Sequence, residues 1–322
     1  RTLTVTGDVI IASGAILDVT NQNDTHTFNI GGNLANAGTL DLSGPTADDF
    51  CNVNFNGSAN QTISGSGATT VFNLITINNS GAANNNIVEV TSTNFTTPAN
   101  FLTLTDGTFK LSTGATLTLT GGDLNLTAPD GFIVNHASAV LDIGNNDITV
   151  NGGDFQLLAG TVNQGTGNDL FGVVTGSATL SGGTLNANGQ FQMTGGTTTI
   201  SGATINLDPN VTSALADTTH IFEAAGAANL TFSSGSVIVI DPPNSPDTAN
   251  AIQLVSGAGT KSLTGGTFQL GNGVSTTAGS TDGFDVNCGS GLTIGNLVVN
   301  NLATNIATRH VRLITNTCSL AG

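Results

Sequence analysis

The sequence predicts an all-β fold: a right-handed parallel β-helix, or three-sided β-solenoid, with coils of roughly 23 residues. Three observations predict it. Apolar and polar residues alternate over short segments, glycines separate those segments, and one short motif recurs along the chain. The composition agrees, because only 8% of the 322 residues are charged, which leaves too few Glu, Lys and Arg for a helical bundle.

The expected strands are short and alternate with period two. The clearest of them, in chain order, are residues 2–6, 116–120, 123–127, 148–150 and 198–200. Alternation puts Leu, Val and Ile on one face of each strand and Thr, Asn and Ser on the other. Residues 213–228 come closest to a helical pattern, but Gly226 interrupts it. We therefore expect no long helix.

A recurring unit sets the expected coil length. It reads Gly, then Thr or Asp, then an apolar, a polar and an apolar residue. Copies begin at Gly38, Gly107, Gly122, Gly153, Gly183 and Gly266. The interval between the first two copies corresponds to three coils of roughly 23 residues each. A strand and turn of about 7.5 residues, used three times per circuit, would give such a coil.

The regular pattern weakens once along the chain. Residues 206–250 contain Pro209, Pro242, Pro243 and Pro246, and proline favours loops that leave a stack of strands. We therefore expect a main β-solenoid over residues 1–205, irregular coils with a proline-rich loop over 206–250, and a continuing β-solenoid over 251–322.

Charge and composition exclude several classes of function. The chain has 5 Lys and Arg, 21 Asp and Glu, and a net charge of −16, so it lacks the basic patch that nucleic-acid binding requires. The sequence contains no run of 18 apolar residues, so we expect no membrane-spanning segment. Polysaccharide-degrading β-helices need facing carboxylates or cations and usually aromatic sugar subsites. Trp and Tyr are absent, and the acidic pairs are Asp48-Asp49 and Asp282 with Asp285. Adjacent carboxylates on a strand point to opposite faces, so we interpret Asp48-Asp49 as a solvated corner and expect no enzymatic activity.

Two features resemble a known class of proteins. Residues 73–81, Asn-Leu-Ile-Thr-Ile-Asn-Asn-Ser-Gly, and the repeated Gly-Gly-Thr units resemble the β-solenoid passenger repeats of large bacterial surface proteins. These include filamentous adhesins, autotransporter-like proteins and, most similar of all, the giant repeat adhesins exported by the type IX route. The resemblance covers nearly the whole chain and brings no catalytic residues with it.

The resemblance implies a location, a role and partners. It implies a non-catalytic structural or adhesive segment of an extracellular, cell-surface stalk or filament. The expected partners are further repeats of the same polypeptide, or copies of the chain, stacked end to end. A surface glycan or another cell-surface target is a further expected partner. The alternatives are a calcium-stabilised adhesin and a polysaccharide-degrading β-helix enzyme.

Calcium is the one cofactor that the sequence suggests. Residues 165–171 resemble a single copy of the calcium-binding nonapeptide repeat, and residues 144–148 match it less well. Asp147, Asn168 and Asp169 are the candidate ligands. Calcium β-rolls repeat this motif in tandem, whereas this chain does not, so the competing interpretation places these residues at coil corners.

Two modification sites are suggested by short motifs. Asp217-Thr218-Thr219 and Asp247-Thr248-Ala249 resemble the O-glycosylation acceptor of bacteria with type IX export. The candidate acceptors are Thr218 and Thr248.

Three cysteines are too few for a disulfide framework. Cys51, Cys288 and Cys318 are read either as three buried hydrophobic residues or as a Cys288–Cys318 bridge between neighbouring coils with Cys51 free. The histidines have no metal-ligand spacing; they are His26, His136, His220 and His310.

Overall fold

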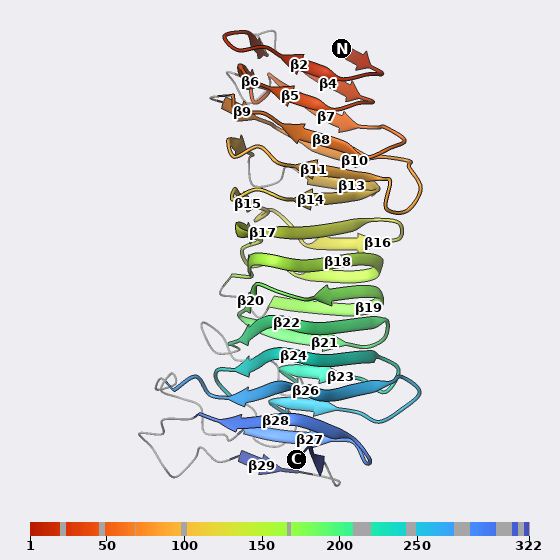
Figure 1. Ribbon diagram of the computed structural model, residues 1–322, viewed down its shortest axis with the longest axis vertical. Helices are drawn as coiled ribbons and strands as arrows, with labels where there is room; N and C mark the ends of the chain where they lie inside the picture. Colours follow the sequence, from red (N-terminus) through yellow and green to blue (C-terminus); the bar gives the residue numbers. More distant parts are fainter. Residues whose placement is uncertain are drawn as a thin grey trace.

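The computed structural model describes residues 1–19, 24–44, 49–67, 69–97, 102–165, 169–208, 220–242, 249–273, 284–300, 311–314 and 319–321. Every regular element in these ranges is a β-strand, and all strand pairs are parallel. The strands stack into an elongated rod, with the first coil at one end and the last at the other (Figure 1). The predicted fold, a three-sided parallel β-helix without long helices, is confirmed for the described residues.

The first half of the rod has one short strand on each of three faces per coil. The first sheet contains β1 (Thr2–Val5), β4 (Thr25–Ile30), β7 (Phe50–Phe55), β10 (Ile75–Asn78) and β13 (Leu102–Asp106). The second sheet begins with β2 (Val9–Ile11), β5 (Leu34–Asn36), β8 (Gln61–Ser64), β11 (Ile87–Val90) and β14 (Thr108–Leu111). The third contains β3 (Ile16–Asp18), β6 (Thr39–Asp41), β9 (Thr69–Val71) and β12 (Phe95–Thr96).

In the second half, long strands bend around the corners and join the faces into one continuous sheet. The long strands are β17 (Gly131–Asp142), β18 (Ile148–Asn163), β19 (Asp169–Leu180), β22 (Thr197–Leu207), β24 (Asn229–Val239) and β26 (Lys261–Leu270). The shorter strands of this half are β15 (Thr116–Thr118), β16 (Leu124–Thr127), β20 (Thr184–Ala187), β21 (Gly189–Met193), β23 (Phe222–Ala224), β25 (Ile252–Leu254), β27 (Phe284–Cys288), β28 (Thr293–Val299), β29 (Val311–Leu313) and β30 (Ser319–Leu320). The ladder from β22 through β24 and β26 to β28 runs across the proline-rich stretch without a break.

The coil length matches the expected value only in the middle of the rod. Phe109 pairs with Phe132, and Phe132 pairs with Phe155, so each of these two steps equals the expected coil of roughly 23 residues. Near the C-terminal end the step is longer, since Leu230 pairs with Lys261. The extra residues fall between strands and leave the strand pairing intact.

Glycine at the corners is required by close packing of successive coils. Gly183 has a φ of +75°, and a Cβ atom there would lie 2.4 Å from the carbonyl oxygen of Gly160 in the preceding coil. A side chain would be both strained and blocked by backbone at this position. Gly38, Gly107 and Gly153, which begin other copies of the recurring unit, are likewise packed against backbone of the preceding coil, whereas Gly122 has open space around it.

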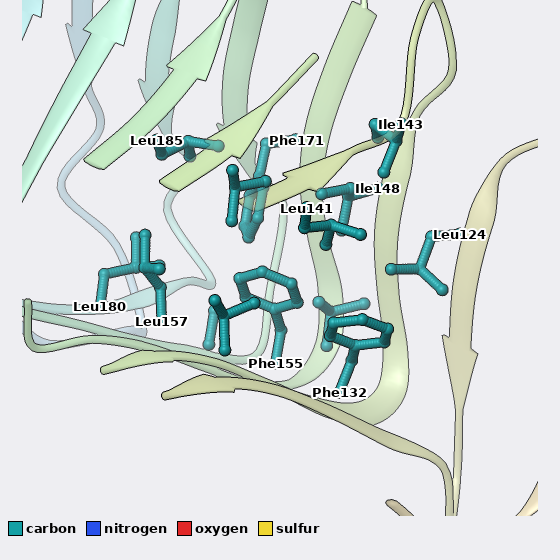
Figure 2. Close-up of a cluster of buried hydrophobic side chains, with 14 of the residues drawn as sticks. Leu124, Phe132, Leu141, Ile143, Ile148, Phe155, Leu157, Phe171, Leu180 and Leu185 are labelled. Atoms are coloured by element: carbon teal, nitrogen blue, oxygen red, sulfur yellow. The ribbon is translucent and has the colours of Figure 1, made fainter. Parts of the chain in front are cut away.

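A ladder of phenylalanines fills the interior. Phe171 lies between Phe155 and Phe191, with ring centroids 5.2 Å and 4.7 Å apart (Figure 2 shows Phe132, Phe155 and Phe171 among the surrounding Leu and Ile side chains). Each fully buried aromatic side chain removes a large apolar area from water. The fully buried members are Phe55, Phe72, Phe109, Phe132, Phe155, Phe171, Phe191, Phe222, Phe232, Phe268 and Phe284.

Candidate functional site

Asp and Asn residues that stand directly before a strand, or at its first position, link several coils to the next. The backbone N–H of Asp147 donates to Asp123 Oδ1 at 3.0 Å, and the N–H of Leu170 donates to Asp147 Oδ1 at 2.7 Å. The same arrangement recurs in four further pairs: Asn33 with Asp8, Thr62 with Asn33, Ile87 with Asn60, and Thr260 with Asn229. These side chains satisfy backbone donors at the corners, where strand pairing is interrupted.

The calcium candidates fall within this corner pattern. Asp147 uses its carboxylate to accept the Leu170 N–H, Asp169 is 5% exposed at the start of β19, and Asn168 lies outside the described residues. Over the described ranges, no group of three or more His, Cys, Asp or Glu side chains is placed to hold a metal ion. The geometry of Asp147 therefore favours the corner interpretation over direct calcium ligation.

The acidic pair considered for sugar chemistry is only partly described. Asp285, in β27, is buried and accepts two hydrogen bonds from Arg312 in β29, with Nε and Nη2 each 2.5 Å from a carboxylate oxygen. The two residues are direct partners in the strand register. Asp282 lies outside the described residues, so what the structure assigns to Asp285 is an ion pair that joins the last two coils.

Of the cysteines and candidate glycosylation sites, some lie within the described residues and others lie outside them. Burial raises the pKa of the Cys51 thiol to about 11, so this free cysteine stays protonated and behaves as a core residue. Cys288 is disulfide-bonded. Its expected partner Cys318 lies outside the described residues, as do Thr218 and Thr248.

His220 has a specific role at a corner. Its Nδ1 accepts a hydrogen bond from the backbone N–H of Asn250 at 3.0 Å, which requires a neutral ring nitrogen. Burial lowers the pKa of His220, and the nearby Glu223 raises it by less. His26 and His136 join no metal cluster in the described ranges.

A pH dependence follows from His220. The folded pKa of His220 lies below the unfolded value of about 6.5. Its contribution to stability is therefore fully present above about pH 6.5 and is lost as the pH falls from there through the lower folded pKa. We expect the melting temperature of the wild type to fall more between about pH 7.5 and 5.5 than that of His220→Gln. Differential scanning calorimetry measures this, with the exposed His136→Gln as control. Equal pH profiles for wild type and His220→Gln would contradict the assignment.

The two ends of the rod expose side chains that belong to the interior. Leu3 pairs in register with the buried Phe28 but is 56% exposed. At the other end, Leu313 follows the buried Val286 and is 69% exposed, and Leu320 follows the buried Ile294. The interior columns of the β-helix therefore open to solvent at both ends.

A cavity marks the N-terminal opening. It measures about 270 Å³ and its walls include Leu3, Leu17, Phe28 and Leu42. Leu17, Phe28 and Leu42 are core or core-contacting residues, so this hollow is a gap in the apolar interior rather than a polar cleft. The sequence indicated strong strands at both ends, but which Leu faces inward becomes visible only once the register is known.

No known relative identifies the chain. Comparisons with protein-family models, with curated proteins and with solved structures all find no match. The described residues contain no helix that could cross a membrane. We call the two open ends of the rod the end faces and define them by Leu3 at one end and by Leu313 and Leu320 at the other.

Proposed function

We propose that this chain is a non-catalytic structural or adhesive β-solenoid segment, part of an extracellular stalk or filament at the cell surface. The observation that carries the proposal is the pair of apolar end faces. Within the described residues, β1 pairs only with β4, β2 only with β5, and β3 only with β6, so each strand of the first coil has one free edge.

The exposed apolar side chains and free strand edges at the end faces would be more stable if another structural unit covered them. A free strand edge with exposed interior side chains invites pairing with another strand, and repeat proteins avoid this with polar capping units or by continuing the stack. A further β-coil fits best, because it would pair with the free edges and bury Leu3 or Leu313 at once. That coil comes from more of the same polypeptide or from a second copy of the chain.

The side surfaces of the rod also support the proposal of a structural role. Asn163, Asn186 and Asn206 stand in successive coils, and the amides of Asn186 and Asn206 each donate to the preceding Asn at 2.8 Å. Such ladders satisfy the outward-facing polar groups coil by coil. With a net charge of −16 and few Lys and Arg, the surface suits a stalk that resists association through its sides.

Substitution at the end faces tests the proposal. A lysine at Leu3 or Leu320 places a charge where the next coil would stack, so we expect Leu3→Lys and Leu320→Lys to reduce end-to-end association of the 322-residue chain. Light scattering after size exclusion and negative-stain electron microscopy measure the assemblies. The matched control is Ile10→Lys, because Ile10 is 75% exposed on the side of the same first coil, between the inward-facing Val9 and Ile11.

The mass of the native species separates the two forms of the proposal. Stacked copies give multiples of 32.1 kDa that depend on Leu3, whereas one long polypeptide gives a single larger chain. A native 32.1 kDa species that stays monomeric at high concentration would contradict both forms.

A further inference from the structure

The two end faces of the rod differ in shape. At the N-terminal end, the cavity of about 270 Å³ lies where the third face turns into the first, between Leu17 in β3 and Leu3 in β1. Phe28 and Leu42 of the next coil also line it. An apolar cavity of roughly 150 Å³ in a protein core already accommodates benzene, so this hollow has room for apolar side chains of another structural unit.

The C-terminal end exposes apolar side chains on the same two faces. Each coil passes through the first, second and third faces in turn, so β29 lies on the first face and the second half of β28 on the third. Val299, at the end of β28, follows the buried Leu270 in register and is 57% exposed. Leu313, in β29, is 69% exposed. These two side chains flank the corner that is hollow at the opposite end of the rod.

The direction of the strands distinguishes the ways in which two copies can stack. When unlike end faces meet, the strands of both copies run parallel and each face continues onto the same face. When like end faces meet, one rod is turned over, so its strands run antiparallel to those of the other. The strand pairs of the described rod are parallel. Stacking of unlike ends therefore repeats the pairing used inside the rod, whereas two N-terminal end faces would bring two hollows together.

We infer that the N-terminal end face binds the C-terminal end face of a second copy of this chain, with Val299 and Leu313 of one copy packed against Leu3 and Leu17 of the other. This inference rests on the proposed end-to-end stacking and adds its direction. The interface joins two different surfaces, so every stack keeps one free end of each kind. Such a heterologous contact extends into a filament when its rotation does not close a ring.

Cysteine cross-linking tests the direction. Ile16 is 69% exposed on the outside of β3, and Val298 is 40% exposed on the outside of β28, so both lie on the third face beside opposite end faces. A short bismaleimide is added to Ile16→Cys alone, to Val298→Cys alone and to their equal mixture. We expect covalent dimers chiefly in the mixture. The background is a mixture of Ile16→Cys with Val174→Cys, because Val174 is 42% exposed far from both ends.

Every cross-linking result either supports or overturns head-to-tail stacking. Dimers in the mixture, above the background and above each variant alone, support it. Equal or greater yields from either variant alone overturn it, as does a mixture that stays at the background. Light scattering on the same samples separates the two proposals. If these samples associate without the expected cross-link, end-to-end stacking stands and its direction is wrong, whereas absence of association overturns both.

A second measurement tests the contact itself. Val299→Asp places a charge inside the inferred contact, whereas Val298→Asp adds the same charge to the outside of the same strand. Since an unpaired charge is costly to bury, Val299→Asp should weaken association of the full chain about tenfold or more. Val298→Asp should change it by no more than about twofold. Equal weakening in both variants overturns the contact. If circular dichroism shows that Val299→Asp does not fold, the cross-linking result decides.

Discussion

Replacing Phe171 with alanine is expected to cost about 3–5 kcal/mol of unfolding free energy, the range for large aromatic-to-alanine changes in a packed core. Phe171 is fully buried between Phe155 and Phe191, so its removal opens a cavity and breaks the aromatic ladder on both sides. Because each coil contacts only its neighbours, the backbone amides of the central coils should be the first to lose their protection from hydrogen exchange. Urea unfolding followed by far-UV circular dichroism measures the loss, as the chain has no Trp or Tyr.

A matched control lies on the same strand. Val174, in β19, is 42% exposed, and Val174→Ala should change the unfolding free energy by no more than about 0.5 kcal/mol. If Phe171→Ala costs no more than Val174→Ala, the ladder does not stabilise the rod as its geometry indicates.

Removing Arg312 is expected to have the second largest effect. Arg312→Met leaves the carboxylate of Asp285 buried without its guanidinium partner, and breaking a buried pair in this way costs about 3–5 kcal/mol. Arg312 is itself 38% exposed while Asp285 is 4% exposed, so we expect a value near the lower end. The loss should be confined to β27 and β29, which hydrogen exchange measured residue by residue resolves.

The Glu89–Lys110 pair supplies the comparison. These residues are also direct partners in the register, at 2.8 Å, but both are partly exposed. Lys110→Met should therefore cost about 1 kcal/mol or less. A cost for Arg312→Met as small as that for Lys110→Met would show that the burial of Asp285 does not decide the strength of its ion pair.

Much of this fold could be predicted because it repeats a local rule. Alternation identified strands such as Leu124–Thr127, and the Gly-Thr or Gly-Asp units predicted the coil length that brings Phe109, Phe132 and Phe155 into one column. That length could not be carried to the C-terminal coils, because residues added between strands change the spacing without changing the alternation. Leu230 and Lys261 are paired in spite of the longer interval between them.

The sites were harder to predict, since they depend on which residues meet across coils. Asp147 stands directly before a strand, which favours a corner position, and its carboxylate accepts the Leu170 N–H of the next coil. Asp106, Asp130 and Asp154 are evenly spaced in the sequence, and that they line one hollow at a coil corner becomes visible only when the coil length is known. Asp285 and Arg312 likewise meet through the register of β27 and β29.

The parallel pairing of coils has a mechanical consequence. The backbone hydrogen bonds between coils run along the long axis of the rod, so a pulling force along that axis acts on every coil boundary at once. The end coils, which have a neighbour on one side only, should detach first. A coil of roughly 23 residues contributes about 5 Å to the length of the folded rod but roughly 75–80 Å once it is drawn out. A tether built this way would yield in steps at its ends, dissipating energy while the rest of its length stayed folded.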